Sequence, residues 1–188
     1  MPALTRRLLE ELRRYKPVDD TEDRHHRAIL SHLVHAASPF SRSKFRPGHV
    51  TASLFIVDPA SHLVLLHHHR RLGRWLQMGG HLDAGEAPAA AALREGREES
   101  GLQDLQLLSD GIFDVDVHGI PAARGEPDHF HYDVRYVAQT RKPGSIAMDA
   151  AESNELAWVE LERAIELMNE EASTRAITKI RTLLAARR

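Results

Sequence analysis

Apolar residues in the first 40 positions recur at the spacing of two amphipathic helices. In the first helix, leucines recur on one side and the pattern stops before Pro17. The second begins with acidic residues from Asp20, keeps its apolar residues on one side and ends at Ser38-Pro39. We therefore expect residues 1–45 to form an N-terminal helical extension that packs on a following domain, residues 46–188.

Beyond residue 45 the pattern changes to short runs rich in β-branched residues and leucine. Residues 49–58 and 62–69 are two such runs, joined by an Asp-Pro pair, and they predict a β-hairpin. A glycine-rich loop, residues 78–86, follows. An alanine-rich helix then begins at Pro88, a favoured residue in the first turn, and ends at Gly101, a favoured residue just past a helix end.

Alternating polar and apolar residues predict two further strands, over residues 113–118 and 129–136. Each would be half-buried, and the two would pair in antiparallel fashion. A strand near residues 156–159 leads into one or two C-terminal helices, with Ser173 or Thr174 as a cap between them. The pattern as a whole predicts a mixed α/β domain with helices before, within and after a sheet.

Composition narrows the classes of protein. The length of 188 residues and the hydrophobic content of 42% suit one domain with a packed core. The formal net charge of −2 argues against a dedicated nucleic-acid coat or a polybasic membrane anchor. The absence of cysteine excludes disulfides, thiolate zinc sites and a cysteine nucleophile. With no signal-peptide pattern and no apolar run long enough to cross a bilayer, we expect a cytoplasmic protein.

Three glutamates occupy about one turn of the alanine-rich helix. Glu95, Glu98 and Glu99 stand at positions i, i+3 and i+4, so they share one helical face. Unpaired, such carboxylates repel one another by about 0.2–0.5 kcal/mol per pair, whereas a hard divalent cation such as Mg²⁺ prefers oxygen ligands. Arg94 can orient a carboxylate through a charge-assisted hydrogen bond. Gly96 falls on the opposite side, so we expect it to face the sheet and the three acids to face solvent.

The loop and helix together, GHLDAGEAPAAAALREGREESGL, resemble the Nudix box, the signature of the Nudix hydrolase superfamily. Five residues separate Gly80 from Glu86, and seven separate Glu86 from Arg94. The remaining positions of the signature are filled by Glu95, Glu98, Glu99, Gly101 and Leu102. Two positions depart from the usual pattern, because Gly96 replaces an apolar residue and Met78 replaces a common proline. Neither position supplies a ligand.

The resemblance implies a Nudix-like mixed β-sheet sandwiched between helices, with the N-terminal helical extension as an addition. It also implies a Mg²⁺-dependent pyrophosphatase that cleaves a diphosphate bond in a small-molecule nucleoside diphosphate derivative, with Mn²⁺ as a substitute cofactor. The metal ligands would be Glu95, Glu98, Glu99 and the Gly80 carbonyl, while Glu86 would support the loop or a second metal. The catalytic residues would be Glu95, Glu98 and Arg94. The base would be one of these acids or an acid on a later loop, Glu152 or Glu155, of which Glu152 is preferred.

The two alternating strands place further polar residues together. One strand carries His129, His131, Asp133 and Arg135 on a single face, and the other carries Asp114, Asp116 and His118. This face is either the wet side of a half-exposed sheet or a substrate pocket or accessory metal site. In the second case His129 and His131 would bind substrate, Arg135 would hold a phosphate, and Arg46 could grip a phosphate or a base. The pattern at residues 67–69 indicates instead a solvated or packed strand end.

Three functions remain to be compared. A Nudix-fold isomerase is disfavoured, because its chemistry uses a cysteine and this chain has none. A catalytically silent Nudix-fold domain that binds a ligand or regulates a partner stays open as the alternative to the hydrolase. The N-terminal helices offer a surface for a homodimer, and neither a membrane nor a nucleic acid is expected as a partner.

Overall fold

The computed structural model describes residues 1–123 and 125–187. The chain divides into two compact units, each built from separate segments. The first unit comprises Met1–Ser53, Gly79–Ala92 and Gly111–Tyr136, and the second comprises Leu54–Met78, Leu93–Asp110 and Val137–Arg188. Three elements continue from one unit into the other, namely β1 (Gly48–Asp58), α3 (Pro88–Ser100) and β7 (His129–Gln139).

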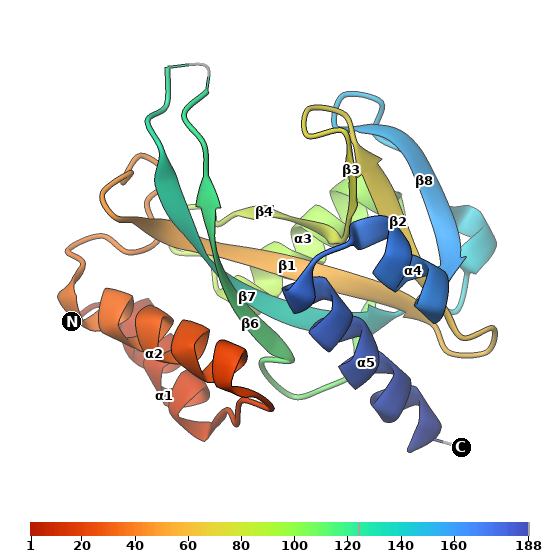
Figure 1. The fold of residues 1–188 in the computed structure, drawn as a ribbon, viewed down its shortest axis with the longest axis horizontal. Coiled ribbons are helices and arrows are strands. Elements are labelled where there is room, and N and C mark those ends of the chain that lie inside the picture. Colours follow the sequence, from red (N-terminus) through yellow and green to blue (C-terminus); the bar gives the residue numbers. More distant parts are fainter. Residues whose placement is uncertain (124, 188) are drawn as a thin grey trace. The chain divides into compact units, whose positions relative to one another are not determined.

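The two predicted N-terminal helices are present in the first unit, as α1 (Ala3–Arg14) and α2 (Asp20–His35) (Figure 1). Leu8, Leu9 and Leu12 of α1 are buried, as their spacing predicts. Asp19 caps α2, since its side chain accepts a hydrogen bond from the Glu22 backbone at 2.7 Å. The helix ends at His35, before the predicted Ser38-Pro39, because the next residue, Ala36, is already extended. The helix α2 packs on β6 (Asp114–Ile120).

In the first unit, the predicted antiparallel pairing of β6 with β7 is confirmed. Its register sets Asp116 opposite Asp133 and His118 opposite His131. A strand that the pattern did not predict, β4 (Met78–His81), occupies the start of the glycine-rich segment and pairs with β1. The sheet order is β3 (Arg74–Leu76), β2 (Leu63–His69), β1, β7 and β5 (Gln106–Leu107), with β4 on β1, β6 on β7 and β8 (Ser153–Glu160) on β2.

In the second unit, the predicted hairpin of β1 with β2 (Leu63–His69) is confirmed, with Ile56 opposite Leu65. The strand β8 (Ser153–Glu160) also pairs with β2. Two very short strands were not predicted, because each is too brief to show alternation: β3 (Arg74–Leu76) and β5 (Gln106–Leu107). The fold is the expected mixed α/β fold, with a sheet, helices and the N-terminal helical extension. The described residues also include one short 3-10 turn, Pro143–Ser145.

The C-terminal helices are α4 (Leu161–Met168) and α5 (Glu171–Ala185), which pack on each other. Asn169 adopts the left-handed conformation (φ 49°) and ends α4. Because α5 already begins at Glu171, Ser173 and Thr174 lie inside it, and the predicted cap at these residues is wrong. The Thr174 hydroxyl donates instead to the Glu170 carbonyl one turn back, at 3.0 Å.

The Nudix-box helix α3 lies close to the sheet at Gly96. A Cβ at this position would stand 2.5 Å from Leu54 Cδ2 and 3.2 Å from Leu105 Cδ1, so only glycine fits without displacing a buried leucine. This confirms the prediction that Gly96 faces the sheet. The approach sets how near the carboxylates of the same helix stand to the core.

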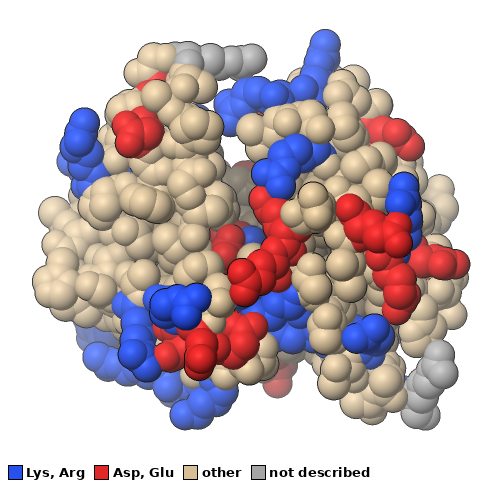
Figure 2. Space-filling model, viewed as in Figure 1, with Lys and Arg blue, Asp and Glu red and all other residues tan. Residues whose placement is uncertain are grey.

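On the face shown in Figure 2, acidic and basic side chains are interleaved, and neither sign forms a continuous coat. This distribution agrees with the small net charge of −2. Within the residues that the structure describes, none of the helices combines the length and the apolar character that a membrane span requires.

Candidate active site

The helix α3 presents its row of glutamates around one arginine. Arg94 Nη1 lies 2.9 Å from Glu95 Oε1 and 3.0 Å from Glu98 Oε2, so a single guanidinium nitrogen donates to both carboxylates. Charge-assisted hydrogen bonds of this kind are short and directional. They hold two acids that would otherwise repel each other on one helical face. The orienting role expected for Arg94 therefore has a physical basis in the structure.

The three glutamates differ in exposure. The Glu98 side chain is 56% exposed and the Glu95 side chain 18%, whereas Glu99 as a residue is only 6% exposed. The expectation that all three face solvent is wrong for Glu99. It stands three residues after Gly96, and residues at this spacing share a helical side, so Glu99 turns toward the side that packs on the sheet.

The loop ahead of α3 is closed by Glu86. Its carboxylate accepts a hydrogen bond from the Asp83 backbone at 2.9 Å, and its own backbone N–H donates to the Asp83 carbonyl at 3.0 Å. These two bonds fix the turn that precedes Pro88. In β4, a Cβ at Gly79 would lie 2.8 Å from the Ala52 carbonyl oxygen, so this backbone approaches β1 too closely for another residue. Gly80 is the next residue of the same strand.

The donor atoms that α3 offers are carboxylate oxygens, and this chemistry fits Mg²⁺. The four residues Arg94, Glu95, Glu98 and Glu99 belong to the second unit, while Gly80 and Glu86 belong to the first. A buried carboxylate at Glu99 and a solvent-facing one at Glu98 give the row both a fixed and an accessible oxygen donor. The row could therefore hold a hydrated cation, which keeps several of its waters.

Glu152, the expected base, is exposed in the turn that precedes β8. Its backbone N–H donates to the Asp149 carbonyl at 3.2 Å, and its carbonyl accepts from the Arg70 N–H at 2.8 Å. The backbone of Glu152 is thus anchored while its carboxylate faces solvent. Burial lowers the pKa of His69, and the nearby Glu152 carboxylate opposes part of that shift by favouring the charged imidazole.

Arg46 is exposed and lines a pocket of about 610 Å³ in the first unit, together with Lys44. Within this pocket the rings of His32 and Tyr132 stack, with centroids 4.0 Å apart and an interplanar angle of 7°. The combination of two basic side chains with a flat aromatic pair is chemically suited to a phosphate and a base.

Five of the seven residues on the polar face of β6 and β7 are buried, and His118 and His131 are half-buried, so the wet-sheet interpretation is wrong. At one part of it lies an ion cluster, which we define as Arg135 with Asp114, Asp116 and Asp133. Arg135 Nε is 3.0 Å from Asp133, Nη2 is 2.9 Å from Asp116 and Nη1 is 3.5 Å from Asp114. All four residues are at most 5% exposed. A guanidinium that already binds three carboxylates has little capacity left to bind a phosphate. Arg135 is therefore not part of the proposed substrate site.

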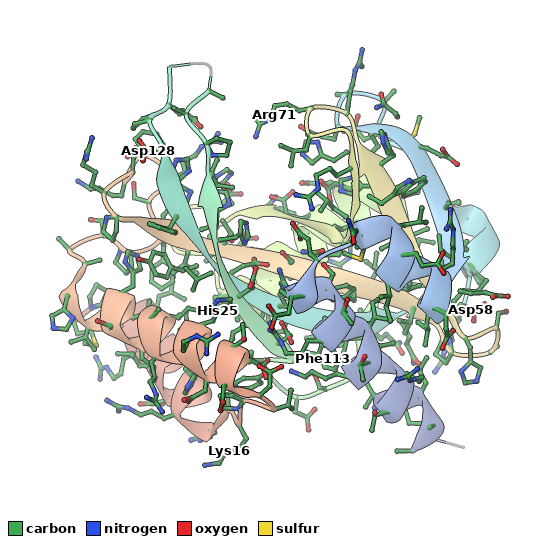
Figure 3. All side chains as sticks on the ribbon, viewed as in Figure 1. Lys16, His25, Asp58, Arg71, Phe113 and Asp128 are labelled. Atoms are coloured by element: carbon green, nitrogen blue, oxygen red, sulfur yellow. The ribbon has the colours of Figure 1, made fainter. Side chains whose placement is uncertain are left out.

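The ion cluster extends to neighbouring elements. Thr51 and Ser53 of β1 donate to the two oxygens of Asp133, at 2.9 and 2.6 Å. His25 of α2, labelled in Figure 3, lies 2.9 Å from Asp116. Burial acts to raise the pKa of Asp116, but Arg135 and the hydrogen bonds from both histidines beside it outweigh burial and hold that pKa well below its usual range. The cluster therefore stays ionised and serves the fold.

The other part of the same face is a histidine cluster, which we define as His49, His129 and His131. Each of the three histidines offers one ring nitrogen that could bind a metal ion, and these nitrogens all lie within 4.8 Å of one another. Burial, together with the neighbouring imidazoles, lowers the pKa of His131 to about 2. The alternating pattern predicts His129 and His131 together but not His49, since a lone histidine on an apolar strand carries no pattern. Elsewhere, His67 packs as predicted, with its Nδ1 2.8 Å from Ser153 Oγ.

Comparisons with known proteins agree with this geometry. The family model for the NUDIX domain matches residues 47–179. An Ap4A hydrolase from C. elegans, solved as a binary complex, is 22% identical, with a TM-score of 0.59 over 73% of this chain and 98% of that chain. A dihydroneopterin triphosphate pyrophosphohydrolase from E. coli is 20% identical, with a TM-score of 0.58 over 72% and 94% of the two chains.

A third solved structure, a MutT NUDIX hydrolase from Burkholderia pseudomallei, is 25% identical, with a TM-score of 0.54 over 69% of this chain and 95% of that chain. The likeness to these structures shows the fold, and the family match spans the sheet, the box and most of the C-terminal helices. The chain therefore belongs to the Nudix family, whose hydrolases act on phosphorus-containing anhydrides.

Proposed function

We propose that this Nudix hydrolase is a Mg²⁺-dependent enzyme that cleaves the diphosphate bond of a small molecule linked to a nucleoside diphosphate. One observation carries the proposal: α3 holds three glutamates in a row, and Arg94 fixes two of them through one nitrogen. A helix built only for solubility gains nothing from such crowding. The crowding is favourable when a divalent cation is bound.

The residues that would hold Mg²⁺ are Glu95, Glu98 and Glu99, with the Gly80 carbonyl as a further oxygen donor. Gly80 lies on β4, and Glu86 closes the loop that follows this strand. When bound, the ion would polarise a phosphoryl oxygen and neutralise charge on the leaving group. Mn²⁺ has the same preference for oxygen ligands and would substitute for it.

The remaining roles belong to side chains. Arg94 would keep the Glu95 and Glu98 carboxylates in position. The exposed Glu152 carboxylate would take a proton from the attacking water, a task that needs a carboxylate free to reach solvent. Arg46 and Lys44, which line the pocket with the stacked ring pair, would bind a phosphate or a base of the substrate.

The substrate panel follows from the chemistry and from the names of similar structures. It comprises nucleoside triphosphates, nucleotide sugars, ADP-ribose, Ap4A and dihydroneopterin triphosphate. Each compound is incubated with the protein and Mg²⁺, and the products are separated by anion exchange. We expect at least one compound to release phosphate, pyrophosphate or a nucleoside monophosphate. Reaction in ¹⁸O-water then identifies the phosphorus atom that is attacked.

Two variants test the assignment of the metal ligands. Glu98→Gln and Glu99→Gln should each lower kcat/KM by about 100-fold or more, because each removes a charged ligand from an ion that contributes several kcal/mol to catalysis. A matched control is Glu166→Gln, since Glu166 is also an exposed helical glutamate paired with an arginine, here Arg163. Turnover that stays unchanged in both ligand variants would refute the assignment. Binding of a panel compound without turnover would favour the silent ligand-binding alternative.

A further inference from the structure

The histidine cluster draws its three members from two strands. His49 is on β1, and His129 and His131 are two residues apart on β7, so both point to the same face. Asp128, labelled in Figure 3, directly precedes His129 and marks this end of β7. His49 is 1% exposed and His129 5% exposed, whereas His131 is half-buried. The cluster is thus a buried set of nitrogen donors with one partly accessible member.

The backbone fixes which ring nitrogens point into the cluster. His49 Nδ1 lies 3.0 Å from the Lys44 carbonyl, and His129 Nδ1 lies 2.8 Å from the Pro127 carbonyl. A carbonyl only accepts, so each Nδ1 carries the proton and each Nε2 keeps its lone pair. This arrangement, with one nitrogen donating to a backbone carbonyl and the other free to ligate, is the usual outer-shell support of a metal-binding histidine.

The nitrogen spacing matches a small tetrahedral ion. His129 Nε2 and His131 Nε2 are 3.3 Å apart. Two nitrogens that each lie about 2.0–2.1 Å from a tetrahedral Zn²⁺ are separated by about 3.3 Å. His49 supplies the third nitrogen, within 4.8 Å of the others. Three histidines with one open position form a known type of zinc coordination.

A pure hydrogen-bond account leaves one atom unexplained. An N–H···N bond between His129 and His131 would satisfy that pair. It would leave His49 Nε2 buried, however, and among the described residues this atom has no hydrogen-bond partner. A buried acceptor without a partner costs about 1–3 kcal/mol. A metal ion satisfies all three nitrogens together.

We propose that His49, His129 and His131 form a binding site for a divalent transition-metal ion, with Zn²⁺ as the principal candidate, separate from the carboxylates of α3. Imidazole nitrogens favour Zn²⁺ and its neighbours, whereas Mg²⁺ favours carboxylate oxygens, so the two donor sets select different ions. The Phe45 and His129 rings form a T-shaped contact with centroids 5.0 Å apart, so an apolar ring borders the site. The ring of His81, 5.0 Å from that of His49, stands beside the three ligands.

The first experiment measures metal content directly. The full chain, purified without a polyhistidine tag, is dialysed against Zn²⁺ in the presence of excess Mg²⁺ and its zinc is quantified. We expect one zinc per chain. X-ray absorption should show a nitrogen shell with imidazole scattering at about 2.0–2.1 Å. Absence of bound zinc, or a shell of carboxylate oxygens alone, would overturn the proposal.

The second experiment changes the ligands one at a time. Loss of outer-shell partners lowers metal affinity by about 10–100-fold, so loss of a ligand in His129→Gln or His131→Gln should lower zinc affinity by about 100-fold or more. His35→Gln is the matched control, since His35 is exposed on α2 of the same unit. Circular dichroism of the metal-free variants confirms that they are folded, and His131 is the more tolerant position because it is half-buried.

Separation from the proposed magnesium site is tested with Glu98→Gln. This variant should bind zinc as the wild type does while its hydrolase activity falls. Zinc lost in Glu98→Gln, or kept undiminished in both histidine variants, would overturn the histidine site. Neither result bears on the hydrolase proposal, which is measured by turnover, so the two proposals fail independently.

Discussion

Strand β7 contributes to two buried polar clusters, the ion cluster with β6 and the histidine cluster with β1, and the hydrogen bonding of the two differs. In the ion cluster, three nitrogens of Arg135 each lie against a different aspartate, and Thr51 and Ser53 add two further donors. In the histidine cluster, two rings are oriented by backbone carbonyls, yet His49 Nε2 has no partner within the described part of the chain. The charged groups of the ion cluster are thus paired within the protein, whereas the histidine cluster keeps one ring nitrogen with no partner among the described residues.

The difference separates two uses of buried polar residues. In a fully paired ion network, the contacts within the network offset the free-energy cost of burying its charges. Such a network has no unpaired group with which to bind a ligand, and it contributes to the fold. In the other kind of cluster, an oriented ring nitrogen has no hydrogen-bond partner, and this nitrogen can still bind a ligand or a metal ion. At the sequence level both clusters appear as polar positions on one alternating face, apart from His49, which lies on β1. The hydrogen bonds distinguish them.

The largest expected effect is the loss of the cation from the ion cluster. Arg135→Met should lower the free energy of unfolding by about 3–5 kcal/mol, because it leaves buried carboxylates without their partner. Urea denaturation monitored by circular dichroism measures the change. The control is Arg163→Met, which removes an arginine that is 60% exposed and paired with an equally exposed glutamate. That variant should change stability by less than about 1 kcal/mol, and equal effects in the two would contradict the role given to the ion cluster.

The next effect is the stabilisation of the histidine cluster by metal. At a free Zn²⁺ concentration about 100 times its Kd, the free energy of unfolding should rise by about 2.7 kcal/mol, since the ion binds the folded chain. His131→Gln should lose this gain, and Arg135→Met should keep it in whatever fraction remains folded. Urea titrations with and without Zn²⁺ measure the gain in unfolding free energy for each variant. A gain of the same size in His131→Gln would mean that the ion binds elsewhere.

Much of the fold was predictable because long elements carry long patterns. The helices α1, α2 and α3, the hairpin of β1 with β2 and the pairing of β6 with β7 all follow from periodicity. The strands β3, β4 and β5 did not, because two to four residues are too few to show a period. The helix boundary near Ser173 was missed because a left-handed Asn169 ends α4 earlier than any side-chain cap could show.

The candidate site was predictable in its spacing and less so in its burial. Sequence spacing places Glu95, Glu98 and Glu99 on one side of α3 and Gly96 against the sheet. It does not show that Glu99 turns inward, since that depends on how closely the helix approaches Leu54. Nor could alternation tell a wet face from a buried one, because an arginine with three aspartates reads as polar in either case. His49 entered only through tertiary structure, which brings β1 beside β7.

The smallest expected effect tests whether the two clusters are independent. Thr51→Val keeps the shape of the side chain and removes one donor to Asp133. The loss should be about 1.5 kcal/mol of unfolding free energy, the low end for a bond to a charged group, because Ser53 and Arg135 still donate to the same carboxylate. Thr178→Val, at an exposed position of α5, is the matched control and should change stability by less than about 0.5 kcal/mol.

Thr51 and His49 are two residues apart on β1, so the same variant also tests whether one cluster disturbs the other. If the saturated network serves only the fold, Thr51→Val should leave zinc affinity within about twofold of the wild type, because pairs without a shared partner behave additively. A large loss of zinc affinity would show that the ion cluster sets the position of the β1 histidine. The two clusters would then act together, because the ion cluster would orient the histidines that bind the metal ion.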